Sequence, residues 1–500
     1  MYINFKYCYI NILLFYYFII LLFKYKVDLI SMSIPKIIHQ LWIGTKPAPI
    51  NLMNTWKDKY PEFKYVFWNE LEIEKRNFKF KCQDKIDEIE EINGKADIMR
   101  WEILYKYGGV FLDADSICIE PISQEILNKK CFAGWEQEDV RKGLIATGTM
   151  GFPKKHPLVK EAIKWIIDNE ISQQKAMLMA WQSVGPGLLT RMYNTGKFND
   201  LHIFPSYLFL PIHLTGLEYT GHGKIYAFQA WGSTKQSYDN MNNMILPKQF
   251  LIPPLEKGVS ILISSYNTKG IYIQECLDSI KHQEGYYNVE VIWINDGSDE
   301  LHTKLLKMYL DNFIKNTRFI TVVYNENDGN KGIGYTLNKG VNMCSYDLII
   351  KMDSDDIMVN NRIQKQLEFM DLNPHVMICG SQINCFKDNI NNIISVTNHP
   401  CITWDEYKIQ KSHWISNHPT LCYRKKAILE AGNYDINKSR MTEDFELTLK
   451  MLKTHGYLHN LNEPLLYYRI HDNQVTNNGG IEGREYWQKN RVNLIDNLIN

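Results

Sequence analysis

Residues 347–356, Asp-Leu-Ile-Ile-Lys-Met-Asp-Ser-Asp-Asp, join an apolar run directly to a group of carboxylates. The run has the length and composition of a buried strand, and Asp353 and Asp355 stand where that strand ends. A second stretch of the same kind, Val-Phe-Leu-Asp-Ala-Asp, occupies residues 110–115. Because residues two apart on an extended chain point to the same side, each stretch can present two acids to one ion.

Closely spaced carboxylates after a strand are suited to a hard divalent cation. Mg²⁺ and Mn²⁺ bind oxygen ligands and keep positions open for substrate phosphates. Taken alone, such a pair is more often a solvated loop after a strand than a metal site. A calcium EF-hand is excluded, because its glycine and glutamate positions hold Cys118 and Gln124 in one stretch and Met358 and Gln364 in the other.

Working outward from the two acid pairs, the chain shows two halves in which short apolar runs alternate with amphipathic stretches. This alternation predicts an α/β fold with mostly parallel sheets and ligands bound at the carboxyl ends of the strands. Prolines at positions 247, 253 and 254 mark the boundary. The expected strands are 36–42, 110–112, 259–264, 289–294, 319–324 and 347–352, and the expected helices are 95–106, 271–282 and one from about 335.

The composition is that of an ordinary globular chain. The 500 residues contain 56 basic and 56 acidic side chains, so no strong field suggests a protein that coats nucleic acid. Hydrophobic residues at 45% exclude wholesale disorder. The 10 cysteines form no CxxC pair, which argues against a zinc site or a disulfide scaffold.

The first 31 residues are an apolar leader. The run 8–23 is almost wholly apolar but short for a membrane span of roughly 20 residues. Flanking tyrosines and lysines favour an uncleaved single-pass signal anchor near the N-terminus over a cleaved signal. Alternatively, translation begins at Met32 and the protein is cytoplasmic.

The first half resembles the DXD-sugar-binding glycosyltransferases of family 32, which have a GT-A fold. The resemblance covers about residues 34–235 and is carried by Ile-Pro-Lys-Ile-Ile-His-Gln-Leu-Trp-Ile-Gly at 34–44 and by residues 96–115. Residues 97 and 100 are spaced to share a helix face. The resemblance implies that Trp42 stacks on the nucleotide base, Asp97 and Arg100 hold the donor sugar, and Asp113 and Asp115 bind metal and diphosphate.

One segment departs from that family. The family usually closes the site with a segment that contains histidine and tryptophan and ends in Ser-Trp, whereas here residues 228–234 read Phe-Gln-Ala-Trp-Gly-Ser-Thr. Ser233 is then the best candidate for a third metal ligand. The missing histidines leave two alternatives open for this half, an active site with a changed ligand set and an inactive one. Gly-Pro-Gly at 185–187 resembles the acceptor-side loop of the family.

The second half resembles glycosyltransferase family 2, the large inverting group with a GT-A fold, over about residues 258–475. The motifs are 259–267, 289–298, the glycine-rich start of a helix at 332–338, and 351–356. A dinucleotide-binding fingerprint is excluded, because its third glycine would be Leu337. The resemblance implies a nucleotide pocket lined by Ser264, Tyr266 and Asp296, with Asp353 at the ribose or metal and Asp355 on the metal.

Two later motifs extend this second resemblance. Glu443-Asp444 resembles the family's Glu-Asp motif, in which the second acid is the general base, so Asp444 is the implied catalytic residue. By itself the pair is also ordinary helix-start chemistry. His471 resembles the family's late histidine, which caps the metal or pyrophosphate. His418 is interpreted as structural or as part of an acceptor-side loop.

The expected protein is therefore a bifunctional glycosyltransferase with two tandem GT-A-type domains, at 34–250 and 257–475, and a polar tail at 476–500. Each domain is expected to use a UDP- or GDP-sugar donor and Mn²⁺ or Mg²⁺, with a glycan or other hydroxyl acceptor and no nucleic acid. The second is expected to invert configuration, whereas the resemblance implies retention in the first. The alternative is one active family 2 domain with a binding or structural first domain. A nucleotidyltransferase is disfavoured, because Ser-Ser-Tyr-Asn at 264–267 replaces the glycine-rich, basic signature it needs.

Overall fold

The chain forms two compact units. The computed structural model describes residues 33–171, 177–232, 238–244, 246–247, 250, 258–285, 287–436, 442–471, 474 and 480–499. The first unit comprises Met1–Tyr219 and Ile225–Leu251, and the second comprises Thr220–Lys224 and Ile252–Asn500. The division near residue 251 falls in the proline-bearing segment, while the short stretch 220–224 belongs with the second unit.

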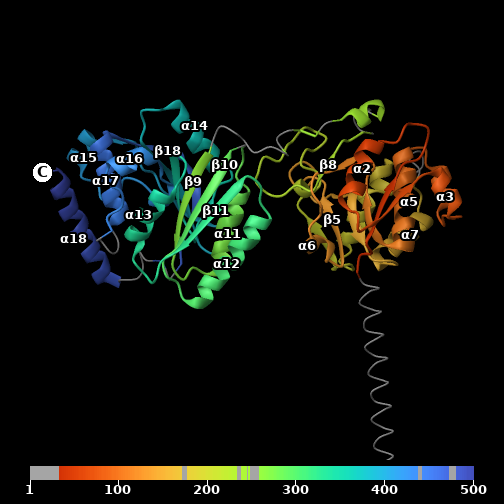
Figure 1. Ribbon diagram of the computed structural model, residues 1–500, viewed down its shortest axis with the longest axis horizontal. Coiled ribbons are helices and arrows are strands. Elements are labelled where there is room, and N and C mark those ends of the chain that lie inside the picture. Colours follow the sequence, from red (N-terminus) through yellow and green to blue (C-terminus); the bar gives the residue numbers. More distant parts are fainter. Residues whose placement is uncertain are drawn as a thin grey trace, which may run out of the picture. The chain divides into compact units, whose positions relative to one another are not determined.

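The first unit is a mixed α/β unit (Figure 1). Its elements are β1 (Ile37–Leu41), α2 (Ile50–Lys59), β2 (Lys64–Trp68), α3 (Glu70–Lys75), α4 (Gln83–Glu88), α5 (Ile92–Tyr107), β3 (Gly109–Leu112), β4 (Ser116–Cys118), α6 (Gln124–Leu127), β5 (Cys131–Trp135), β6 (Ile145–Phe152), α7 (Pro157–Asp168), α9 (Ala180–Ser183), α10 (Pro186–Asn194), β7 (Leu201–Phe204), η1 (Ser206–Leu208), β8 (Ala227–Gln229) and η2 (Tyr238–Asn243).

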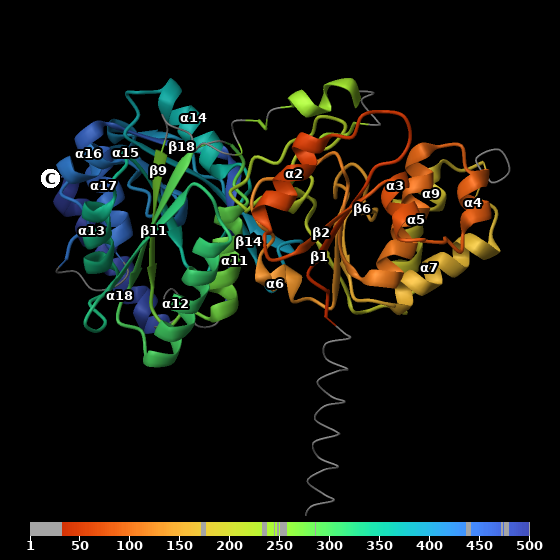
Figure 2. The ribbon, with the colours of Figure 1, turned by 45° about the vertical axis from the view of Figure 1, so that its right-hand side comes forward.

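The main sheet of the first unit has the order β2-β1-β3-β6-β5-β7. Strands β2, β1 and β3 are parallel, and β6 is antiparallel to both of its neighbours. Alternate residues of β3 face opposite cores, because Phe111 packs with α5, α7 and α10 whereas Val110 and Leu112 pack on the side of α2. The sheet is thus covered by helices on both faces (Figure 2), and Asp113 leaves it at the carboxyl end of β3.

The second unit has a larger sheet with more elements around it. They are β9 (Gly258–Ser265), α11 (Gly270–Lys281), β10 (Asn288–Asn295), α12 (Glu300–Lys315), β11 (Ile320–Glu326), α13 (Ile333–Met343), β12 (Leu348–Asp353), β13 (Ile357–Met358), α14 (Arg362–Leu372), β14 (Ile378–Phe386), β15 (Ile393–Val396), β16 (Ile402–Thr403), α15 (Trp404–Gln410), η4 (His418–Thr420), β17 (Cys422–Arg424), α16 (Lys425–Glu430), α17 (Glu443–His455), β18 (Tyr457–Arg469) and α18 (Gly480–Ile499).

The sheet of the second unit begins as four parallel strands in the order β11-β10-β9-β12, and continues through β17, β14, β18 and β13. The chain moves outward from β9 to β10 and β11, then returns to the other side of β9 with β12. Such a reversal places a ligand crevice outside the carboxyl ends of the two central strands. Ser264 and Asp353, the last residues before that crevice, are partners in the register of β9 and β12.

Helices cover both faces of this sheet (Figures 1 and 2). Ile261 and Ile263 of β9 pack with α11, α12 and α14, whereas Leu262 packs with α13, α16 and α17. Helix α18 completes the second face with Leu494 and Ile495, both buried. The segment 476–500, expected to be a polar tail, therefore contains a helix that contributes to the core of this unit.

The α/β class with parallel-rich sheets is confirmed, and the expected strands and helices lie within a few residues of their predicted bounds. The expected helix 95–106 is the second part of α5, which ends at Gly108 with φ +64°. A left-handed glycine at this position lets the chain turn straight from α5 into β3. That turn links Asp97 and Arg100 on the helix to Asp113 beyond the strand.

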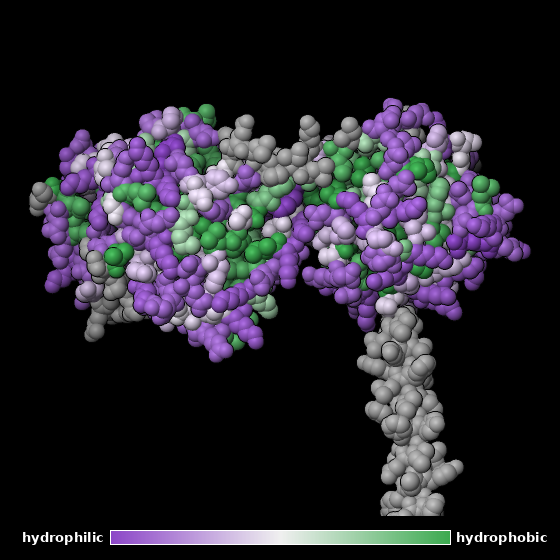
Figure 3. Space-filling view, in the orientation of Figure 1, coloured by the Kyte–Doolittle hydropathy of each residue, from purple (hydrophilic) through white to green (hydrophobic). Residues whose placement is uncertain are grey.

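The surface is mainly hydrophilic, and apolar residues form separate patches on the face shown in Figure 3. Single exposed apolar side chains are normal on a folded protein. Within the described ranges, no helix combines the length and apolarity needed to cross a membrane. The apolar leader at 1–31, for which a signal anchor was expected, lies outside the described residues, as does Ser233.

Candidate active sites

The carboxylates of the first unit are held at the end of β3 by polar side chains from distant parts of the chain. Gln40 Nε2 donates to the Asp113 carbonyl at 3.0 Å, and Ser116 Oγ donates to the same oxygen at 2.7 Å. The backbone N–H of Gly232 donates to Asp115 Oδ2 at 2.8 Å. These contacts fix the loop that carries both acids beside β4 and β8.

Arg100 connects the expected sugar-binding helix to the acid pair. Its Nη2 lies 2.6 Å from Asp113 Oδ1 and 3.3 Å from Asp97 Oδ1, and its Nη1 donates to the Thr147 carbonyl. Three residues predicted from the sequence therefore lie together. A Cβ on Gly185 would come within 2.3 Å of Asp97 Oδ2, so the Gly-Pro-Gly loop approaches Asp97 as only glycine allows.

Gln229 is a site residue that sequence reasoning did not single out. It ends β8, and its Nε2 donates to Asp115 Oδ1 and, at 3.3 Å, to Asp113 Oδ2. A single atom thus reaches both carboxylates, so one cation at that point would reach both as well. The acid pair fits a divalent ion, with Asp113 and Asp115 as the ligands. The signal for Gln229 was its place in the segment where the family has histidine.

Burial changes the protonation of two acids in this site. It raises the pKa of Asp97 to about 6, against the lowering effect of Arg100. It also raises the pKa of Asp115 to about 6, with Asp113 adding to the rise. A bound cation would favour the ionised form of both acids. Trp42 lies at the edge of the same unit, partly buried, with its Nε1 donating to the Lys46 carbonyl at 2.7 Å.

In the second unit, the end of β12 contains an ion pair between a buried lysine and a partly buried carboxylate. Lys351 is fully buried, and its Nζ lies 2.5 Å from Asp353 Oδ1 and 2.7 Å from the Met352 carbonyl. Burial tends to raise the pKa of Asp353, but Lys351 and neighbouring cations outweigh it and hold that pKa below its ordinary value. Sequence reasoning did not single out Lys351 as a site residue, although it lies in the motif at 351–356.

Asp355, just after β12, and His471, just after β18, come together although 116 residues separate them in the chain. His471 Nε2 lies 2.9 Å from Asp355 Oδ2. Two neighbouring ligands of an octahedral ion with bonds of about 2.1 Å are about 3 Å apart, so this pair fits a divalent cation. Arg469 holds the loop below them, donating from Nε to the Asp355 carbonyl and from its backbone N–H to Asp356 Oδ1, at 2.8 and 2.9 Å.

The three residues expected to line the nucleotide pocket lie in different environments. Ser264 lies between Ile294 of β10 and Asp353 of β12 in the sheet register. Tyr266 is 52% exposed in the loop after β9. Asp296 is buried, and its carboxylate accepts from the backbone N–H groups of residues 331 and 332 and from the Asn327 amide at 2.8–3.0 Å. Asp296 therefore holds the glycine-rich loop in place through hydrogen bonds to its backbone.

Asp444 lies at the start of α17, in the same region as the acids of β12. His418 of η4 is partly buried, and this burial together with Lys351 lowers its pKa to about 4, while Asp444 and Asp353 both act on it in the opposite direction. Its Nε2 is 2.7 Å from Tyr434 Oη. Asp444 and Asp353 are therefore both close enough to His418 to act on its charge.

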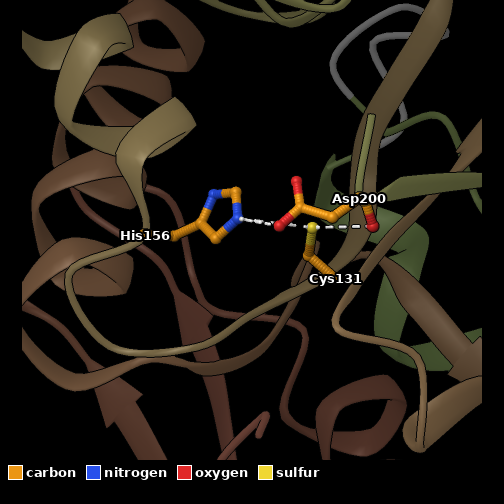
Figure 4. Close-up of side chains that lie close together, drawn as sticks. All are labelled: Cys131, His156 and Asp200. Carbon is orange, nitrogen blue, oxygen red and sulfur yellow. Dashed lines mark hydrogen bonds and ion pairs between the residues drawn. The ribbon is translucent and has the colours of Figure 1, made fainter. Parts of the chain in front are cut away.

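A separate cluster at the other edge of the first unit joins Cys131, His156 and Asp200 (Figure 4). His156 Nε2 lies 3.3 Å from Asp200 Oδ2 and 3.6 Å from Cys131 Sγ. Its Nδ1 accepts from the Leu158 N–H at the start of α7, so the ring proton is on Nε2. A metal-bound histidine normally donates from its second nitrogen, which this cap prevents. We interpret the cluster as a hydrogen-bonded clamp between β5, α7 and β7.

Comparisons with known proteins match a region of each unit to glycosyltransferases. Residues 48–133 match the description "Glycosyltransferase sugar-binding region containing DXD motif", and residues 260–432 match "Glycosyl transferase family 2". A relative in Escherichia coli, the O-antigen biosynthesis glycosyltransferase WbnJ, is 33% identical over 209 residues, covering 40% of this chain and 75% of the relative.

Further relatives carry related names. The Escherichia coli UDP-Gal:alpha-D-GlcNAc-diphosphoundecaprenol beta-1,3-galactosyltransferase is 28% identical over 48% of this chain and 87% of its own. Inositol phosphoceramide mannosyltransferase 3 of Schizosaccharomyces pombe is 27% identical over 33% of this chain and 47% of its own. The solved structure of S. aureus TarS 1–349 with UDP-GlcNAc has a TM-score of 0.38 and 17% identity, over 48% of this chain and 66% of that one.

The family matches and the relatives together support a transferase that uses nucleotide-sugar donors. The chain belongs to the glycosyltransferases, with a DXD-containing sugar-binding region in its first unit and a family 2 domain in its second.

Proposed function

We propose that the chain is a bifunctional glycosyltransferase with one donor site in each unit. The observation that carries the proposal is the recurrence of the same arrangement, an acid pair at the carboxyl end of a parallel strand with its own fixed partners. Donors are UDP- or GDP-sugars, and the acceptor is a hydroxyl group of a glycan or glycoconjugate. The galactosyltransferase relative supports a UDP-sugar in at least one unit.

In the second unit, Asp444 is proposed as the general base. A carboxylate at the acceptor side takes the proton from the attacking hydroxyl while the sugar's anomeric carbon is attacked from the face opposite the nucleotide. Asp355 and His471 would hold Mn²⁺ or Mg²⁺, which as a Lewis acid stabilises the charge of the departing diphosphate. Asp353, neutralised by Lys351, is left to contact the donor.

Two variants test this assignment in the full chain. Asp444→Asn keeps the shape of the side chain but removes the base, so transfer by this unit should fall about 10²–10⁴-fold while Mn²⁺-dependent UDP binding persists. Asp355→Asn should weaken that binding as well. The anomeric configuration of the product, read by NMR, should be inverted relative to the donor. Full transfer by Asp444→Asn would refute the base assignment.

A second candidate function is specific to the first unit, which on this alternative binds a sugar nucleotide without transferring it. It is favoured by the Gln229 amide, which occupies the point shared by Asp113 and Asp115 where a cation would sit. Gln229→His supplies an imidazole ligand at that point. An increase in Mn²⁺ affinity without any donor turnover in the variant or the wild type would support the binding role.

Attachment to a membrane through residues 1–31 is part of the proposal for the whole protein. The test compares membrane fractions of cells that express the full chain or residues 32–500. Recovery of the full chain alone with membranes after a high-salt wash supports an anchor, and equal recovery of both in the soluble fraction contradicts it.

A further inference from the structure

Helix α18 places the charged side chain of Arg491 in the interior of the second unit. Arg491 is 3% exposed, and its guanidinium lies 4.2 Å from the ring centre of Phe445. Trp414 and Trp487 contact it from other sides at 4.8 and 4.0 Å. Its Nη1 donates to the His413 carbonyl. The aromatic rings and this hydrogen bond hold the guanidinium in one orientation.

A buried guanidinium requires a counterion, because it stays charged and its desolvation is costly. Burial lowers the pKa of Arg491 to about 10, and Asp444 is the first of the groups that raise it again, followed by Tyr407 and Glu443. Nη2 lies 3.9 Å from Asp444 Oδ1. Asp444 is therefore the carboxylate that balances this charge most directly.

The same contact constrains Asp444. Its side chain is 31% exposed, and Oδ1 also accepts from the Phe445 N–H at 2.6 Å. Arg491 and the first turn of α17 thus both engage Oδ1. Both contacts are made to Oδ1, which leaves Oδ2 to accept the proton of an acceptor hydroxyl in the proposed reaction.

We propose that Arg491 is a positioning residue for the general base, delivered to the site by the C-terminal helix. This inference rests on the proposed function, in which Asp444 is the base of the second unit. Arg491 touches neither donor nor acceptor in this scheme. It fixes the rotamer of Asp444 and compensates its charge, and the aromatic rings of Trp414, Phe445 and Trp487 fix Arg491 in turn.

The experiment uses the full chain with five single substitutions. Arg491→Met keeps an unbranched apolar stem between the rings but removes the charge, Arg491→Lys keeps the charge, and Asp444→Asn removes the base. Lys489→Ala, at an exposed position of the same helix, is the matched control. Nucleotide release from UDP-galactose, UDP-glucose, UDP-N-acetylglucosamine and GDP-mannose is followed with Mn²⁺, and the activity abolished by Asp355→Asn is assigned to the second unit.

Arg491→Met should lower kcat of that activity 10- to 100-fold while KM for the donor and the affinity for UDP with Mn²⁺ change less than twofold. Arg491→Lys should recover most of the loss, and Lys489→Ala should match wild type. An unchanged kcat in Arg491→Met would overturn the proposal. A parallel loss of UDP binding and thermal stability would also overturn it, because it would show a structural role only.

The two proposals fail in different ways. If Asp444→Asn remains active, the base assignment is refuted whatever Arg491→Met does. If Asp444→Asn is inactive and Arg491→Met is active, only the positioning role is refuted. Should none of the four donors react, the pair is tested by urea unfolding. A midpoint shift of the double variant Arg491→Met/Asp444→Asn that differs from the sum of the single shifts supports the pairing, and simple additivity overturns it.

Discussion

Lys351 neutralises one of the carboxylates at the end of β12. Three acids crowd this loop, and burial with Asp355 and Asp353 nearby raises the pKa of Asp356 well above its ordinary value. A buried ammonium 2.5 Å from Asp353 removes one negative charge from the group without using a metal. The loop can therefore fold before a cation binds, and Asp355 with His471 remains for the ion.

We predict that Lys351→Met lowers the free energy of unfolding of the second unit by up to about 3 kcal/mol, because it leaves the partly buried Asp353 carboxylate without its partner. Adding Asp353→Asn to this variant should restore part of the loss. Lys307→Met is the matched control, since it breaks the partly exposed pair with Glu326 at 3.0 Å and should cost no more than about 1 kcal/mol. Urea titrations measure all three. Equal, small effects at both lysines would contradict the role of Lys351.

His39 gives the first unit a defined pH dependence. Its ring is buried in β1, with Nε2 bonded to the Gly108 carbonyl at 2.8 Å and Nδ1 accepting from Trp68 Nε1 at 3.0 Å. Burial lowers the pKa of His39 from 6.5 to about 4. The folded state therefore binds fewer protons than the unfolded state between these values. The stabilisation is complete above pH 6.5 and is lost as the pH falls towards 4, by at most roughly 3 kcal/mol.

The prediction concerns the difference between wild type and His39→Asn. Asp97 and Asp115, whose pKa values are raised to about 6, act in the opposite direction, since they stabilise the fold as the pH falls from 6 to 4. Both proteins retain these acids. Guanidinium midpoints of the first unit at pH 7.5 and 5.0 should therefore fall more steeply with acidification in wild type. Parallel midpoints would refute the assignment.

At the scale of single residues, the sequence revealed the acids but not their partners. Asp113, Asp115 and Asp355 could be found because a short motif places them after an apolar run. Gln229 and Arg491 lie more than 40 residues from the carboxylates they contact. Gln229 stands in the segment where the resembled family has histidine, but its contact with both acids follows only from the fold, and Arg491 stands in no recognisable pattern.

At the scale of elements, the start of α7 depends on His156. Its Nδ1 caps the helix, while Nε2 reaches Asp200 and Cys131 on the segments before β7 and at β5. We predict that His156→Ala destabilises the first unit by about 1–2 kcal/mol through loss of the cap and the buried hydrogen bond. His202→Ala, at an exposed position of β7, serves as the control.

The cluster at the start of α7 can be tested as a metal site. Because the cap keeps the proton on Nε2, micromolar Zn²⁺ should not raise the melting temperature of wild type more than that of His156→Ala, and a chelator should not lower it. A zinc-dependent rise seen only in wild type would refute the assigned tautomer and establish a metal ligand at His156.

Helices and strands could be predicted where the sequence pattern was unambiguous. The strands β9, β10 and β12 are continuous apolar runs because both faces of the parallel sheet are covered, and such runs are conspicuous in the sequence. Helix α18 was not expected, because its surface is largely polar; among its described side chains, Leu494, Ile495, Leu498 and Ile499 pack against the core, and Arg491 contacts aromatic rings. A buried arginine is read from sequence as a surface residue.

At the scale of the whole molecule, the chain contains two α/β glycosyltransferase units whose strand-end acids contact different side chains. The first holds its acids with Arg100 and Gln229, and the second with Lys351 and His471. Since the partners differ, the two sites need not share a donor or even a metal affinity. Fusion would keep a product of one site near the other and raise its effective concentration there.

The last prediction therefore separates the two sites by their donors. Residues 32–500 are assayed for nucleotide release from a panel of UDP- and GDP-sugars with Mn²⁺, beside Asp115→Asn and Asp355→Asn. Each asparagine keeps the size of the side chain but removes the charge that a cation needs, so each should abolish release at its own site, by at least about 100-fold, and leave the other within twofold. Two donors lost with different variants establish two working sites. One donor lost only with Asp355→Asn assigns the first unit to binding, as the Gln229 amide suggests, and loss of every donor in either variant would contradict independent sites altogether.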